Sequence, residues 1–285
     1  MKENLKNLSS LIDKQKLAAI ATISKVATSL KIPFFLIGAS ARDILLQKNP
    51  NIPIYRATLD IDFGVRVSSW DEYTKLKKGL IKTGNFVQTR EDQRLKYKDH
   101  VVIDLIPFGN ISDENLNIRW PRQDMFMNIL GFEEAFRNAQ TVKLRSNPVL
   151  KLKLVTLAGL ATMKIIAWSD RYPERRKDAE DLFIIMYNYT DLGNFERIYS
   201  EMPDLLKSDD FDYVGAGARL LGRDIAKILS MKTKEKILEI LNKETGKQDR
   251  YRLIEDIMRS DSARSSSFER IFDLLEDLKT GISET

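Results

Sequence analysis

The chain has 285 residues, of which 43% are hydrophobic and 31% charged, a composition that indicates one large or two ordinary globular domains. It has no cysteine and one histidine, His100, which excludes disulfides, thiol nucleophiles, iron–sulfur clusters, cysteine-based zinc sites and multi-histidine metal sites. The formal net charge of +5 suits a polyanion such as nucleic acid or a nucleotide, and equally an ordinary mixed-charge surface.

The N-terminal segment MKENLKNLSSLIDKQK lacks the apolar core and small-residue cleavage site of a signal peptide. The longest apolar stretches, at 33–37 and 152–161, are far too short to span a bilayer. We therefore expect a cytoplasmic protein with no membrane partner. Apolar residues at helical spacing predict helix in the first thirty residues, up to Pro33.

The segment PFFLIG, Pro33–Gly38, is a short apolar run typical of a buried strand. ASARDILLQ follows it as a predicted helix, with Ser40 as a candidate cap. Further strands are predicted at 58–67, 85–89, 94–98, 100–109 and 140–145, and a helix at about 69–82.

The pattern changes after Asn147-Pro148. Helical periodicity is predicted over 150–169, 174–189, 195–202, 213–229, 233–242, 249–259 and 268–279, with Ser265–Ser267 as the cap region of the last helix. The expected fold class is α+β, with an N-terminal mixed-sheet domain over 1–148 and an all-helical domain over 149–285.

Three aspartates stand on predicted strands. Asp60 and Asp62 are two residues apart, so period-two alternation places both on one face, about 7 Å apart along the backbone. Asp104 interrupts the apolar run VVIDLIPF, where an ionised carboxylate is costly unless it is paired or binds a metal. If neighbouring strands bring it beside the other two, the three form a magnesium site suited to phosphoryl transfer. An Asp-x-Asp pair by itself also occurs by chance on exposed strands.

The strand–Gly38-Ala-Ser40–helix segment is a tight turn that precedes the aspartates. A helix N-terminus offers backbone N–H groups and a positive dipole end to phosphates. A single Gly-x-Ser carries little information, and its order before Asp60, Asp62 and Asp104 carries more.

In this order, FLIGASARDILL, RATLDIDFGV and VVIDLIPFG resemble the nucleotidyltransferase superfamily with the DNA polymerase β-like fold. Gly38 matches the first glycine of the family turn and Ser40 its hydroxyl, whereas Ala39 departs from the usual second Gly or Ser. The resemblance implies that Asp60, Asp62 and Asp104 are catalytic and bind Mg²⁺. It also implies that Gly38, Ser40, Arg42 and Thr58 contact the nucleotide.

Two branches of the superfamily are similar to this chain. Ala41-Arg42-Asp43 looks like the turn of CCA-adding tRNA nucleotidyltransferases, and 122–128 echoes their second basic motif. Arg56-Ala-Thr58-Leu-Asp60-Ile-Asp62 resembles a motif of AbiEii/MenA-like toxins of type IV toxin–antitoxin and phage-defence systems. A second motif is similar too: a predicted helix that contains Lys164, followed by Arg175-Arg-Lys-Asp178-Ala-Glu-Asp181. The second branch fits better, over about 33–190. It implies an NTP substrate, an RNA acceptor such as a tRNA 3′ end, and an antitoxin partner.

The resemblance places Lys164 at the triphosphate and Asp178 in the nucleotide site. Lys164 lies in an otherwise apolar helix, from which a lysine can also snorkel to the surface. Asp178 and Asp181 are three residues apart, so they share a helix face and could pair with Lys164 or Arg176, or be solvated.

Two further features remain open between a functional and a structural interpretation. The cations at 171 and 175–177, interleaved with Trp168 and Tyr172, could receive RNA or be ordinary helix-end charges. His100 could be a general base on the strand of Asp104 or simply begin that strand.

The sequence thus predicts transfer of a nucleoside monophosphate from an NTP to an acceptor hydroxyl, with RNA as the acceptor. A small molecule or protein side chain is an alternative acceptor, and a nonenzymatic nucleotide-binding module is an alternative of another class.

Overall fold

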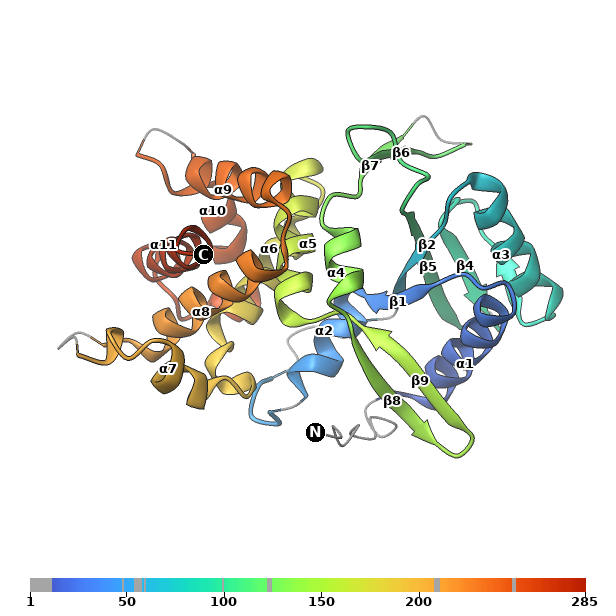
Figure 1. The fold of residues 1–285 in the computed structure, drawn as a ribbon, viewed down its shortest axis with the longest axis horizontal. Coiled ribbons are helices and arrows are strands. Elements are labelled where there is room, and N and C mark those ends of the chain that lie inside the picture. The colour runs from blue at the N-terminus through green and yellow to red at the C-terminus, as the bar shows by residue number, and fades with distance from the viewer. Residues whose placement is uncertain are drawn as a thin grey trace. The chain divides into compact units, whose positions relative to one another are not determined.

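The computed structural model describes residues 12–47, 49–53, 58, 60–98, 100–121, 125–207, 211–247 and 250–285. The chain divides into two compact units, one of residues 1–44 and 56–156 and the other of 45–55 and 157–285. We call them the sheet unit and the helical unit and describe each by itself (Figure 1).

The sheet unit is built on a seven-stranded mixed sheet with the strand order β3-β4-β5-β2-β1-β9-β8. Its strands are β1 (Phe34–Ile37), β2 (Asp60–Arg66), β3 (Phe86–Gln88), β4 (Arg94–Tyr97), β5 (Val101–Phe108), β8 (Gln140–Ser146) and β9 (Val149–Leu154). This sheet, together with the helices that follow it, confirms the α+β fold class expected from the sequence.

The central strands β1, β2 and β5 pair in a defined register. β1 pairs antiparallel with β2, so that Phe35 lies opposite Gly64. β2 pairs parallel with β5, so that Phe63 lies opposite Leu105. Phe35, Phe63 and Leu105 are fully buried. Phe63 shares a face with Leu36 and Phe35 lies on the other face, so the centre of the sheet is buried on both sides.

Among its described residues the sheet unit contains the helices α1 (Lys14–Ser29), α2 (Gly38–Leu46, whose last two residues fall in the helical unit), α3 (Trp70–Lys82) and α4 (Phe132–Arg137). Asp13 caps α1 by accepting hydrogen bonds from the backbone N–H groups of Gln15 and Lys16. The short α4 was not predicted, nor was the two-stranded sheet of β6 (Asn117–Arg119) and β7 (Phe126–Asn128). The ring of Phe136 on α4 lies 5.5 Å from that of Phe35, which attaches α4 to the sheet.

The prediction of a helix over 150–169 is wrong in its first part. Residues Val149–Leu154 form strand β9, which pairs antiparallel with β8, and helix α5 begins only at Leu157. The physical reason is the alternation Leu150-Lys-Leu152-Lys-Leu154, in which the leucines are buried and the lysines are not. This is a period-two pattern, but it runs directly into the apolar helix and resembles a continuation of it.

The helical unit contains α5 (Leu157–Asp170), α6 (Arg176–Tyr187), α7 (Phe195–Glu201), α8 (Tyr213–Ile228), α9 (Met231–Thr245), α10 (Arg252–Met258) and α11 (Phe268–Ser283). All seven match predicted helices in position. The hydroxyl of Ser267 accepts from the N–H of Arg270, which confirms the expected cap of the last helix.

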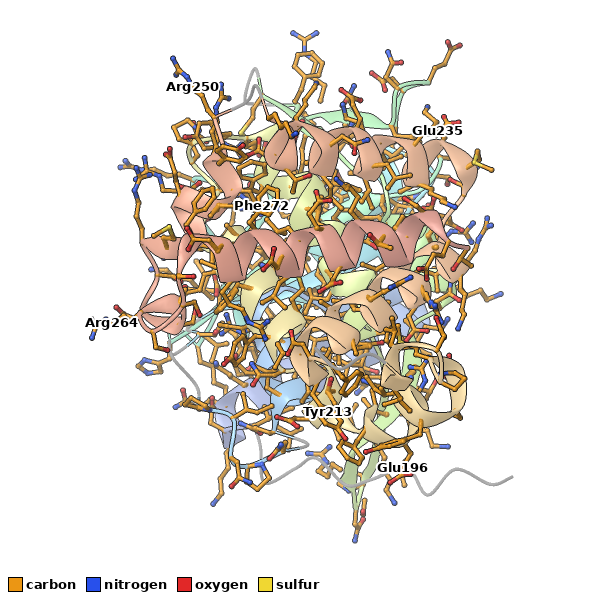
Figure 2. All side chains as sticks on the ribbon, turned by 90° about the vertical axis from the view of Figure 1, so that its left-hand side faces the viewer. Glu196, Tyr213, Glu235, Arg250, Arg264 and Phe272 are labelled. Atoms are coloured by element: carbon orange, nitrogen blue, oxygen red, sulfur yellow. The ribbon has the colours of Figure 1, made fainter. Side chains whose placement is uncertain are left out.

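Figure 2 faces this unit, with α11 and its Phe272 crossing the view. α8 packs along α11 so closely that a Cβ at Gly281 would stand 1.9 Å from the carbonyl oxygen of Arg219. Within the described part of the chain, we find no helix with the length and apolarity needed to cross a membrane.

Candidate active site

The three predicted aspartates meet on one face of the sheet. Asp62 on β2 lies directly opposite Asp104 on the parallel strand β5, and Asp60 lies two residues before Asp62. Oxygen atoms from the three carboxylates all lie within 4.8 Å of one another. Asp60 and Asp62 are half-buried and Asp104 is buried. Like charges directly opposite each other destabilise a sheet, so the cluster has to be explained.

Gly38 makes room for this cluster. Its φ of +71° lies in the left-handed region, and a Cβ added there would stand 1.9 Å from the Oδ2 of Asp62. Any other residue would therefore be strained and would displace the Asp62 carboxylate. The glycine that the sequence assigned to phosphate binding thus has a second task, which is to let α2 begin against Asp62.

Ser40 ties α2 to the start of β2. Its hydroxyl donates a 2.7 Å hydrogen bond to the carbonyl oxygen of Asp60. The expectation that Ser40 caps the helix is wrong, because α2 already begins at Gly38 and Ser40 lies within its first turn. The bond leaves the lone pairs of the Ser40 oxygen available to accept hydrogen bonds.

Arg94 is a site residue that the sequence interpretation missed. It lies opposite Asp104 on the antiparallel neighbour β4, and its Nε and Nη2 each donate a 2.8 Å bond to a different oxygen of Asp104. The bonds to Asp104 raise the pKa of Arg94 above its ordinary value. The sequence does show that β4 alternates, which puts Arg94 and Lys96 on one face and the buried Leu95 and Tyr97 on the other. That Arg94 lies beside Asp104 follows only from the pairing register of β4 with β5.

Arg42 and Thr58 converge on a second residue that was not predicted, Asp43. Arg42 is 2% exposed and donates to Asp43 Oδ1 through Nε at 2.9 Å and Nη2 at 2.6 Å. Thr58 donates its hydroxyl to the Oδ2 of Asp43 at 2.9 Å. These contacts link α2 to Thr58, two residues before β2, so Arg42 and Thr58 position the segment that carries Asp60.

The donor set of the aspartate cluster suits a hard divalent cation. Three carboxylates supply only oxygen ligands, which is the chemistry that Mg²⁺ selects. Two of them are partly open to solvent, so ligand oxygens or water can complete the coordination. Asp60, Asp62 and Asp104 are therefore arranged as residues that could hold a metal ion.

Lys164 and Asp178 meet each other in the helical unit. The ammonium of Lys164 on α5 lies 2.6 Å from Oδ1 of Asp178 and 2.6 Å from Oδ2 of Asp181, both on α6. All three side chains are buried. Burial opposes the charge of Lys164, but Asp181 and Asp178 outweigh it and hold its pKa above the ordinary value. Of the alternatives left open for these aspartates, which were Lys164, Arg176 or solvent, the structure shows the pairing with Lys164.

Of the two interpretations left open for the cations near Trp168, the structure does not support stacking of RNA on this ring. This side chain is 3% exposed, and its indole N–H donates to the buried carboxylate of Asp256 at 3.0 Å, so its ring is not available for stacking. Arg175 donates to Asp178 at 2.8 Å.

His100 is exposed in the turn before β5, which begins at Val101, so the strand predicted to begin at His100 begins one residue later. Arg56 and residues 122–124, which carried part of the family resemblance, lie outside the described residues.

No family model and no curated protein matches this chain. Among solved structures, it is similar to the antibiotic-resistance factor ANT(2'')-Ia at 15% identity and a TM-score of 0.36, over 68% of this chain and 97% of that one. A nucleotidyltransferase-like protein from Paracoccidioides brasiliensis gives 17% identity and 0.38, over 70% and 93%. A CCA-adding enzyme in its second apo form gives 11% and 0.33, over 97% and 84%. At TM-scores below 0.5 these likenesses carry no weight for the function, which rests on the chain's own residues.

Proposed function

We propose that this protein is a metal-dependent nucleotidyltransferase that moves a nucleoside monophosphate from an NTP to an acceptor hydroxyl and releases pyrophosphate. The observation that carries the proposal is the aspartate cluster, with three carboxylates from two adjacent strands directed at one another within 4.8 Å. Beside it, Gly38 opens the first turn of α2. Carboxylates that face one another this closely are explained by a cation that they share with phosphate oxygens.

Asp60, Asp62 and Asp104 would hold Mg²⁺. When bound, the ion supplies charge neutralisation at the phosphates and lowers the pKa of a coordinated hydroxyl. Catalysis of this kind consists mostly of positioning and electrostatics. The aspartates are fixed for that task by the sheet register and by the bond from Ser40 to the Asp60 carbonyl.

The acceptor oxygen forms a bond to the α-phosphorus, and the bond from that phosphorus to the bridging oxygen of pyrophosphate breaks. In this proposal the acceptor hydroxyl gives its proton to Asp104. Both oxygens of Asp104 accept from Arg94 in the structure, so Arg94 must release at least one of them. The released guanidinium is then free to bind a phosphate oxygen.

The triphosphate would lie at the N-terminus of α2, the end where backbone N–H groups and the positive dipole end favour anions. Gly38 and Ser40 belong to that first turn. Arg42 and Thr58, both bound to Asp43, act as positioning residues for it. We assign Lys164 and Asp178 a positioning role in the helical unit, because the lysine charge is already taken by two aspartates.

RNA is the acceptor that we propose, specifically a 3′-terminal hydroxyl such as that of tRNA, in a toxin–antitoxin or phage-defence setting with an antitoxin partner. The support is the sequence resemblance together with the positive net charge of +5.

The test is to incubate the protein with each labelled NTP, Mg²⁺, total RNA and cell extract, and to see which fraction takes up label. Asp60→Asn should lower transfer about 10³-fold or more, because metal binding supplies several kcal/mol of charge stabilisation. Asp71→Asn, an exposed aspartate of the same unit, is the matched control and should behave as wild type. Full transfer by Asp60→Asn contradicts the site assignment. Label in a protein or small-molecule fraction contradicts only the choice of acceptor.

A further inference from the structure

The β8–β9 hairpin is basic to an unusual degree. Residues 139–156 contain Lys143, Arg145, Lys151 and Lys153 and no aspartate or glutamate. In Figure 1 the two strands project from the sheet as a long two-stranded arm. The chain as a whole has 46 basic and 41 acidic residues, so a segment of this length with cations alone departs from the average.

Two of these lysines lie directly opposite each other. The register pairs Lys143 with Lys151 across the two strands, and like charges in that position destabilise a sheet. Among the residues that the structure describes, neither ammonium forms an ion pair. Lysines also protect edge strands against aggregation, which explains cations on the edge strand β8. On β9, Lys153 donates to the carbonyl oxygen of Phe136 at 3.3 Å, and Lys151 is left unexplained. An anionic ligand would remove the repulsion.

The register also places these lysines on the face that carries the aspartates. Leu154 lies opposite Leu36, and Leu36 lies opposite Phe63, so these three share one face. Lys151 and Lys153, at odd offsets from Leu154, therefore lie on the other face, together with Asp62 and Asp104. Lys143, opposite Lys151, belongs to that face too.

Strand geometry sets the separations. With strands about 4.8 Å apart and about 3.3 Å per residue, the Cα of Lys153 lies roughly 12 Å from that of Asp62 and the Cα of Lys143 roughly 20 Å. Lys153 is held against α4, with its ammonium 4.3 Å from the centre of the Phe136 ring. Lys143 and Lys151 lie further along the arm. The lysines thus form a row that leads away from the aspartates.

We propose that this lysine face, formed by Lys143, Lys151 and Lys153, binds the phosphate backbone of the RNA whose 3′ end enters the active site. The inference rests on the proposed function, and it adds a binding site for the part of the RNA that lies outside the active site. Lysines two residues apart on a strand are about 7 Å apart, a spacing comparable to the step between phosphates of an extended strand. Contacts of this kind position a nucleic acid without reading its sequence. An acidic protein is a poorer fit, because protein interfaces are depleted in lysine and need an apolar centre.

The experiment measures binding of a fluorescently labelled single-stranded RNA by the full-length protein over a range of salt concentrations. The variant is Lys143→Gln/Lys151→Gln. Its control, Lys75→Gln/Lys78→Gln, removes the same charge from two exposed lysines of α3 in the same unit. Each phosphate contact on a single strand contributes about 0.7 to the slope of log K against log salt, so the hairpin variant should lose about 1.4 and the control nothing. Lys151→Arg should keep the wild-type slope.

The outcomes separate this inference from the proposed function. An unchanged slope in the hairpin variant, with wild-type protein binding RNA, overturns the lysine face and leaves the transferase standing. Binding of polyglutamate rather than RNA through the same lysines overturns both the lysine face and the RNA acceptor. Mg²⁺-dependent binding of NTP in the absence of RNA, measured in parallel, should be equal in all variants, since Lys143 and Lys151 lie outside the proposed nucleotide and metal site.

Discussion

Both units contain a cluster of close aspartates, and the two clusters are built in opposite ways. In the sheet unit, three carboxylates face one another and two are half-exposed. In the helical unit, Asp178 and Asp181 face an ammonium group, with Lys164 at 2.6 Å from each, and all are buried. In the first cluster one arginine, Arg94, binds one of three carboxylates, and a further cation from solution could be shared among them. In the second cluster Lys164 lies between both aspartates.

The comparison shows what distinguishes a metal site from a structural ion pair when residue types are similar. Burial without a partner is costly for a carboxylate, so buried aspartates carry a lysine or arginine. Asp104 has such a partner in Arg94, whereas Asp60 and Asp62 lie nearer to solvent, where an external cation can reach them. Substitutions at Lys164, Gly38, Arg94 and Asp277 test this distinction.

Replacing Lys164 with methionine should destabilise the protein by about 3–5 kcal/mol, because two buried carboxylates would lose their common partner. The unfolding free energy in urea measures the loss, and Lys177→Met, an exposed lysine on α6, should change it little. If the Lys164→Met variant has normal stability but no longer binds NTP, Lys164 contacts the triphosphate and is not a structural partner of the two aspartates.

Replacing Gly38 with alanine should reduce transfer about 10²-fold, because the new Cβ would stand 1.9 Å from Asp62 Oδ2 and displacing a catalytic group by an ångström has an effect of this size. Gly84→Ala is a matched control. Gly84 also has a positive φ, of +74°, but nothing lies within 4 Å of its Cβ position. The Gly84→Ala variant therefore measures the effect of backbone strain without a steric contact. Equal effects of both substitutions on kcat would show that the contact with Asp62 is irrelevant.

Replacing Arg94 with glutamine should lower the half-saturating Mg²⁺ concentration about fivefold. Arg94 competes with the ion for Asp104, and its 33% exposed side chain limits the contribution of the pair to about 1 kcal/mol. A titration of activity against Mg²⁺ measures this, with exposed Arg90→Gln as control. A higher Mg²⁺ requirement in Arg94→Gln would instead show that the arginine orients Asp104 for the metal.

The sequence predicted the aspartate cluster because its evidence is local. Period two fixes the shared face of Asp60 and Asp62, and a charged residue within an apolar strand marks Asp104. It did not predict Arg94, whose role depends on β4 pairing antiparallel with β5 in one register. Pairing between strands is a property of the folded chain, and no spacing within either strand encodes it.

The same distinction explains β9 and Trp168. The alternation of leucine and lysine at 150–154 is visible in the sequence, but its proximity to an apolar helix hid it. Trp168 lies beside a cluster of cations along the chain, yet its indole binds Asp256, 88 residues away. The cations near Trp168 in the sequence suggested an exposed binding surface, but tertiary packing buries the Trp168 ring.

Asp277 on α11 is a carboxylate of the helical unit that can be compared with Asp178. The question is whether nearby cations neutralise its charge as fully as Lys164 neutralises that of Asp178. Its Oδ2 and that of Asp212 flank Gly215, at 2.6 and 2.7 Å from the Cβ position. Burial and the nearby Asp212 raise the pKa of Asp277 to about 6. An acid whose pKa is raised on folding favours the folded state below its unfolded pKa and loses that contribution as pH rises through the folded value.

The free energy of unfolding of wild type relative to Asp277→Asn should therefore fall between about pH 4 and pH 7, by about 1 kcal/mol once solvent screening is allowed for. Urea unfolding at pH 4.5 and 7.5 measures it, with the exposed Asp261→Asn as control. The difference between variants is the useful quantity, because Asp212, held by Arg270, and Asp224, held by Arg197, have lowered pKa values and act in the opposite sense. If the difference in unfolding free energy between wild type and Asp277→Asn does not change with pH, Arg219 and Arg270 neutralise Asp277 as fully as Lys164 neutralises Asp178 and Asp181. Asp277 would then be a third carboxylate of the helical unit that is neutralised by cations of its own unit.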